Sequence, residues 1–173
     1  PLLVHVMPFL SGYTVENMNW PINIFKHMFK LKNIIAIKED TKNIKYGKIL
    51  LSKIQPRFTI IFAGRKNYFL NFAKHGFKAY LNSSSIIEPK IDQIFWKLLN
   101  SNNLLAKKFV EKVDDPFWDG IVKKYGWHRV NKASLEVIGM MSRIERLPLV
   151  SLNNKQMKDV EKWVIKTLEI LKK

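Results

Sequence analysis

The sequence has no cysteine, which excludes disulfide bonds, thiol nucleophiles and zinc sites built on thiolates. It also lacks an uninterrupted apolar run of about 18 residues, the length that a membrane-spanning helix requires, so we expect no contact with a membrane. Residues 1–8 carry no charged region of the kind that begins a signal peptide, and we expect a cytoplasmic protein. A chain that begins with proline inside an apolar run indicates a piece cut from a longer protein.

Acidic residues are few, because 14 Asp and Glu stand against 30 Lys and Arg, a formal net charge of +16 at pH 7. Only five of the 30 are arginine. Base readout and phosphate recognition favour arginine, and the lysines are scattered along the whole chain, which is typical of a solvated face. Attraction of anionic substrates and binding of nucleic acid are the alternatives that the charge leaves open.

The first half of the chain alternates between two patterns. With 173 residues, 47% of them hydrophobic, the chain has the size of one globular domain or of a domain with an appended piece. Short apolar runs predict strands buried on both faces of a parallel sheet, at residues 2–7, 34–37, 58–63 and 79–81. Amphipathic stretches between them predict helices over residues 21–31, 43–54 and 67–75. The spacing is that of βα units.

The second half carries only helix periodicity, which predicts helices over residues 88–99, 104–113, 118–125, 129–141 and 155–171. We expect Pro116 to break the second of these from the third, and Asn153 or Asn154 to cap the last. Four strands are half of an eight-stranded barrel, and no glycine-rich phosphate loop follows any strand. The pattern therefore favours a half-barrel followed by a helical tail.

Parallel α/β proteins carry their chemistry at the carboxyl ends of the strands, and Lys38 directly follows an apolar strand. A lysine at this place is partly desolvated, which disfavours its ammonium form. A neutral amine attacks a ketone or aldehyde carbon and forms a Schiff base. Lys38 is therefore a candidate nucleophile, and the alternative is a structural ion pair with Glu39 or Asp40.

His5 lies inside an otherwise apolar strand, with Val4 and Val6 on the opposite face. It is either a core residue or, if its strand neighbours that of Lys38, a group that transfers protons near neutral pH. The other three histidines show no metal-ligand spacing with one another or with carboxylates, and we expect neither a metal site nor a cofactor.

Two further strand ends offer polar or open positions. Gly64 ends the third strand, where the absence of a side chain lets a ligand approach the backbone, although a plain turn explains it equally well. Asn82 begins the segment Asn-Ser-Ser-Ser at residues 82–85, which is either a site for a carboxylate or sugar hydroxyls, or a polar loop.

Residues 33–40 (NIIAIKED) resemble the Schiff-base strand of the dihydrodipicolinate synthase / N-acetylneuraminate lyase family, whose members are class I aldolase-type (β/α)8 barrels. In that family an apolar strand is followed by Lys-Glu and a short polar turn. Other landmarks resemble the family in order and spacing. The segment PFLSG at 8–12 resembles the loop after strand five, residues 58–64 resemble strand seven with its glycine, and residues 79–89 resemble strand eight and its exit. Residues 126–128 and 146–149 resemble parts of the helical extension.

The resemblance implies an α/β fold that is the C-terminal half of a (β/α)8 TIM barrel, strands five to eight, plus a C-terminal helical extension. Residues 1–87 would form the half-barrel βα units, and residues 88–173 the last barrel helix and the extension. An open half-barrel exposes strand edges and part of its apolar interior. We therefore expect the 173-residue chain expressed alone to be inactive and poorly soluble.

The resemblance also implies site residues. Lys38 would be the Schiff-base lysine, Gly64 would line the pocket, and the backbone around Leu81 together with Asn82 would face the keto-acid portion of the substrate. His5 stands where many members have a tyrosine that relays protons, so it becomes the candidate relay.

Further departures concern the substrate. Leu10 stands where dihydrodipicolinate synthases have an arginine, and Arg65 and Lys66 stand where some synthases have acidic residues. The resemblance thus implies a lyase, aldolase or dehydratase acting on a different 2-keto acid or sugar acid, for which pyruvate is the simplest probe. Its partner would be a small anionic keto acid, and the complete protein a homo-oligomer, often a tetramer in the family. The alternatives are a non-catalytic or regulatory barrel homologue and a basic nucleic-acid-binding module.

Overall fold

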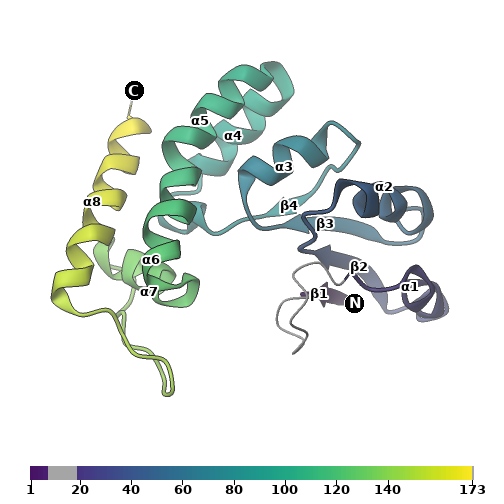
Figure 1. Cartoon of the computed structure of the whole chain (residues 1–173), viewed down its shortest axis with the longest axis horizontal. Coiled ribbons are helices and arrows are strands. Elements are labelled where there is room, and N and C mark those ends of the chain that lie inside the picture. The colour runs from purple at the N-terminus through teal and green to yellow at the C-terminus, as the bar shows by residue number, and fades with distance from the viewer. Residues whose placement is uncertain (8–18, 173) are drawn as a thin grey trace. The chain divides into compact units, whose positions relative to one another are not determined.

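The four apolar runs form a single parallel sheet in strand order β1-β2-β3-β4 (Figure 1). The computed structural model describes residues 1–7 and 19–172, and the chain divides into two units, Pro1–Asn82 and Ser83–Lys173. The strands of the first unit are β1 (Leu2–Val6), β2 (Ile34–Glu39), β3 (Thr59–Ala63) and β4 (Tyr80–Leu81). Helices α1 (Ile22–Met28), α2 (Ile44–Lys53) and α3 (Lys66–Ala73) alternate with them, so the expected βα order is confirmed.

One face of this sheet is packed with aromatic side chains. Phe62 on β3 is 1% exposed, and its ring lies 4.3 Å from that of Phe72 and 6.0 Å from that of Phe69, both on α3. Val6 and Ile37 are fully buried on the same face, as the pairing of strand residues requires. Burial of these large side chains against the helices is the main stabilising contribution in this unit.

The opposite face of the sheet is only partly buried by the described residues, contrary to the expectation of strands buried on both faces: Ala36 and Ala63 on it are buried. Leu3 and Leu81 lie on it and are 47% and 52% exposed. His5 and Lys38 share this face, because the register pairs them directly and places them two residues from Leu3 and Ala36. The face that carries the candidate residues is therefore partly accessible.

Arg57 fixes the chain where α1 leads into β2. Its guanidinium donates to the backbone carbonyls of Phe29 at 3.3 Å, Leu31 at 3.1 Å and Ile34 at 3.2 Å. These acceptors run from the end of α1 to the first residue of β2, so the side chain of Arg57 ties this connection together.

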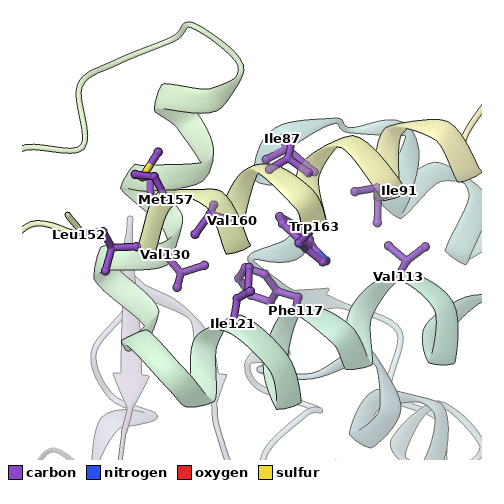
Figure 2. Packing of buried hydrophobic residues seen from close by; sticks show 12 residues of the cluster. Ile87, Ile91, Val113, Phe117, Ile121, Val130, Leu152, Met157, Val160 and Trp163 are labelled. Carbon is purple, nitrogen blue, oxygen red and sulfur yellow. The ribbon is translucent and has the colours of Figure 1, made fainter. Parts of the chain in front are cut away.

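The second unit is helical. It contains η2 (Ser84–Ile87), α4 (Lys90–Ser101), α5 (Asn103–Asp115), η3 (Pro116–Val122), α6 (Lys123–Tyr125), α7 (Trp127–Val137) and α8 (Asn154–Ile170). Figure 2 shows its core, in which Phe117, Val160 and Trp163 point toward one another. The expected cap of the last helix is confirmed at Asn153, which forms a capping box with Gln156.

The expected helix break at Pro116 is wrong. The helical path continues through this residue, whose φ of −61° and ψ of −30° are helical, and η3, which begins here, is a π-helix in which hydrogen bonds span five residues. Proline has no backbone N–H, so it costs one hydrogen bond at this point without ending the helix. The helix expected over residues 129–141 is also shorter than expected: it ends at Val137, and Gly139 follows with φ at +75°.

Among the described residues, every helix is too short or too polar to cross a lipid bilayer.

Candidate active site

Lys38 and His5 meet at the carboxyl ends of β2 and β1. The two residues are direct register partners in the parallel pairing of these strands. The Nζ atom of Lys38 lies 2.8 Å from the Nε2 atom of His5. Their side chains are 18% and 33% exposed, so the amine is largely but not fully withdrawn from water. The structure thus brings the candidate nucleophile and the candidate proton relay into hydrogen-bond contact.

Asp40 joins this pair. Its Oδ2 atom lies 2.5 Å from Nε2 of His5 and 3.9 Å from Nζ of Lys38, and its side chain is 10% exposed. Sequence reasoning named Asp40 only as one possible ion-pair partner of Lys38. The signal for a larger role was its spacing, because Lys38 and Asp40 are two residues apart and an extended chain directs such residues to the same face.

Glu39, between these two residues, is directed to the opposite face of the sheet and is fully buried. Its Oε1 atom accepts a hydrogen bond from the backbone N–H of Thr41 at 2.9 Å, and Oε2 is buried with no partner among the residues that the structure describes. Burial, with a smaller contribution from the nearby Asp40 carboxylate, raises the pKa of Glu39 to about 8, although the backbone N–H groups of Thr41 and Asp40 act in the opposite direction. Burial and Glu39 also raise the pKa of the Tyr46 hydroxyl. At neutral pH Glu39 is therefore mainly a neutral carboxylic acid.

A second polar group lies at the ends of β3 and β4. The Nδ2 atom of Asn82 donates to the carbonyl oxygen of Gly64 at 2.7 Å, and its Oδ1 atom accepts from Nζ of Lys66 at 3.0 Å. Lys66 is fully buried, and Gly64 has φ at +106°, a conformation that favours glycine. The side chain of Asn82 therefore holds two strand ends together, a role that sequence reasoning did not foresee.

The remaining predicted positions differ in what surrounds them. Leu81 pairs with Ala63 on β3 and carries an exposed side chain. Two hydroxyls of the serine segment are engaged inside the helical unit, because Ser84 donates to Asp114 at 2.6 Å and Ser85 donates to Asp92 at 2.6 Å. These bonds favour the polar-loop interpretation of the serines.

The segment PFLSG and its Leu10 lie outside the described residues, so the expected loop after β1 stays a prediction. Within the described part of the chain, no three His, Asp or Glu side chains gather in a group that could hold a metal ion.

Comparison with known structures shows which fold these elements form. The chain has the α/β fold of barrel enzymes such as 4-hydroxy-tetrahydrodipicolinate synthase from Methylacidiphilum fumariolicum SolV, with a TM-score of 0.78 and 20% identity over 99% of this chain and 55% of that one. N-acetylneuraminate lyase from Fusobacterium nucleatum is similar, with a TM-score of 0.75 and 19% identity over 95% of this chain and 54% of that one. A partial barrel is consistent with the four-stranded parallel sheet.

Sequence comparison identifies the family. Residues 1–167 match the dihydrodipicolinate synthetase family, and the chain belongs to it. A curated relative, 4-hydroxy-tetrahydrodipicolinate synthase from Psychrobacter sp. (strain PRwf-1), is 29% identical over 124 residues, which are 71% of this chain and 40% of the relative. The chain thus spans about half the length, or less, of the proteins that it matches.

Proposed function

We propose that this chain is part of a lyase of the aldolase type that forms a Schiff base between Lys38 and a 2-keto acid or sugar acid. The observation that carries the proposal is the contact of 2.8 Å between Nζ of Lys38 and Nε2 of His5, at the carboxyl end of a parallel sheet in a chain of this family. This is the edge of an α/β sheet at which catalytic residues gather.

The chemistry follows from the amine. Neutral Nζ of Lys38 attacks the keto carbon, and loss of water leaves an iminium ion. The positive nitrogen withdraws electrons from the adjacent carbon, so a C–C or C–O bond at the neighbouring position breaks with its electron pair drawn toward the iminium. His5, in contact with Nζ, takes up and returns the protons that these steps require.

The substrate is a small anionic keto acid. Gly64, Leu81 and Asn82 line the pocket beside Lys38 in this proposal, and the buried ammonium of Lys66 contributes positive potential at the ends of β3 and β4. The net charge of +16 also favours the approach of acidic substrates.

We also propose that the chain supplies strands five to eight of the barrel and that the complete protein is a cytoplasmic homo-oligomer. The exposed side chains of Leu3 and Leu81 support a partial barrel. In a closed barrel this face of the sheet would point into the interior, and these side chains would be buried there. Translated sequence preceding Pro1 is expected to encode four further βα units. Preceding sequence without such units would contradict this assignment.

The function is tested by reductive trapping on the complete protein. Borohydride in the presence of pyruvate, or of a related 2-keto acid, is expected to add the mass of the reduced adduct to the peptide that contains Lys38. The Lys38→Ala variant is expected to gain no adduct, whereas the control variant Lys45→Ala, which removes an exposed lysine on α2, is expected to label like the unmodified protein.

Each other outcome of this experiment has a meaning. Labelling elsewhere, or none with any keto acid that the protein binds, contradicts the proposal. Keto-acid binding without an adduct would favour the non-catalytic homologue. Binding of nucleic acid in a gel-shift titration, lost steeply with added salt, would favour the basic binding module.

A further inference from the structure

We propose that Asp40 is a positioning residue that makes Nε2 of His5 the proton acceptor for Lys38, so that the amine becomes nucleophilic by transfer of its proton inside the site. This inference rests on the proposed function, because it concerns the same amine. It adds a third residue, and a direction of proton movement, to the pair already described.

The geometry around one atom carries the inference. Nε2 of His5 lies 2.8 Å from Nζ of Lys38 and 2.5 Å from Oδ2 of Asp40. An imidazole nitrogen has a single site in the ring plane, which holds either a hydrogen or a lone pair. Nε2 therefore accepts from the Lys38 ammonium or donates to the Asp40 carboxylate, but it does not do both at once.

The two hydrogen bonds define two states of the site. In the first, His5 is neutral with its hydrogen on Nδ1, and the lone pair of Nε2 accepts from the ammonium of Lys38. In the second, one N–H bond of the ammonium has broken, its electron pair stays on Nζ, and the proton is bonded to Nε2 and directed at Asp40. Total charge is the same in both states, and a contact of 2.5 Å with a carboxylate oxygen favours a proton between the two atoms.

The second state also supplies the proton that the next step consumes. Attack of Nζ on the keto carbon leaves a positive nitrogen and an alkoxide, and one proton passes from Nζ to that oxygen to give the neutral carbinolamine. The imidazolium of His5 then protonates the hydroxyl of the carbinolamine. The C–O bond breaks, water leaves with that electron pair, and the lone pair of Nζ forms the C=N bond. His5 returns to its neutral form, so no external acid or base is needed.

The connection between β2 and α2 holds the backbone on both sides of Asp40. Glu39 accepts from the backbone N–H of Thr41, and the hydroxyl oxygen of Thr41 accepts from the backbone N–H of Asn43 at 3.0 Å. Asn43 then caps α2 by accepting from Tyr46. This chain of short-range bonds fixes the backbone on both sides of the carboxylate. Its position beside His5 is therefore built into the β2–α2 connection.

The charged groups around His5 are few in the described part of the chain. Lys38 and Asp40 come within 4 Å of Nε2, and Glu39, which feels the Asp40 charge, is directed to the opposite face. The alternation along β2 thus separates the buried neutral acid Glu39 from Lys38 and His5, which exchange a proton, and from Asp40, which accepts a hydrogen bond from His5.

The test measures the rate of imine formation against pH on the complete protein with pyruvate, by borohydride quenching at successive times. Asp40→Asn is expected to lower this rate at pH 7 by about 100-fold and to move the half-maximal rate to higher pH, because Lys38 must then lose its proton to solvent. Asp40→Glu, which keeps the carboxylate, is expected to recover part of the rate. The control variant Glu111→Gln, which removes an exposed carboxylate on α5, is expected to leave the profile unchanged.

A measurement on the unmodified protein makes the test independent of how the variants fold. Nitrogen-15 NMR of labelled histidine is expected to show a strongly deshielded proton on Nε2 of His5. A wild-type pH profile in Asp40→Asn, or an Nε2 that carries no proton at any pH, would overturn this inference while trapping at Lys38 persists. Absence of trapping in the unmodified protein would overturn the proposed function, and this inference with it.

Discussion

Turnover of the 2-keto acid substrate is expected to fall by about 10⁴-fold or more when Lys38 is replaced by arginine in the complete protein. Arginine keeps the positive charge, and its guanidinium can replace Nζ of Lys38 as the hydrogen-bond donor to Nε2 of His5, which lies 2.8 Å from Nζ in the structure. The guanidinium does not deprotonate in proteins and forms no Schiff base, so the covalent step is lost while the charge is retained. The loss corresponds to about 5.5 kcal/mol of transition-state stabilisation.

The measurement is kcat/KM for consumption of the substrate, together with calorimetric binding of the same keto acid. Binding is expected to persist in Lys38→Arg, and the variant Lys45→Arg is expected to remain within about twofold of the unmodified protein. A Lys38→Arg protein with more than a tenth of normal kcat/KM would contradict the assignment of Lys38 as the nucleophile.

The second large effect concerns the pH dependence of stability, which is expected to change in Glu39→Gln. The pKa of Glu39 is raised from 4.5 to about 8 by burial, so the folded protein holds this proton more tightly than the unfolded chain does. Between these two values the folded state carries more protons, and the free energy of unfolding therefore falls as pH rises from about 4.5 to about 8. Well above pH 8 this group is ionised in both states, and its contribution to the free energy of unfolding is constant.

The size of that change follows from the pKa difference, and about 5 kcal/mol is its upper limit. Glutamine is neutral at every pH and retains an oxygen that can accept from Thr41, so Glu39→Gln is expected to remove this slope and to be more stable than the unmodified protein at pH 9. Urea denaturation at pH 5, 7 and 9 measures both effects. The Glu111→Gln variant, altered at an exposed ion pair, is the control, and parallel curves for Glu39→Gln and the unmodified protein would contradict the prediction.

The sequence was sufficient to place the elements that build the site. Apolar runs bounded by turn residues located each strand to within one or two residues, because a parallel strand needs a continuous apolar segment and little else. The position of Lys38 at the end of such a run, and the chance that the strand of His5 is its neighbour, also followed from the pattern. Consecutive βα units usually place their strands side by side, which is why that pairing could be foreseen.

The sequence was not sufficient for the partners of these residues. The spacing of Asp40 from Lys38 indicates that the two share a face, but it does not reveal that the carboxylate reaches a histidine 35 residues away. Asn82 was expected to bind substrate, and its amide is engaged with Gly64 and Lys66 in the structure. Such contacts depend on the loop backbone, whose course is set by tertiary packing rather than by a repeating pattern.

The π-helix at η3 has a consequence for the alignment of the helical unit. Buried or half-buried Val113, Phe117, Ile121 and Tyr125 recur at every fourth residue. In an α-helix each residue advances by about 100° around the axis. Three steps of four residues each would therefore leave the last side chain about 120° away from the first. The wider turn absorbs much of this rotation and leaves the Tyr125 hydroxyl 2.6 Å from Asp159 on α8. The number of residues in η3 therefore sets the direction in which the following side chains point around the helix axis. A deletion there would turn all of them away from their contacts, whereas a substitution would change only one.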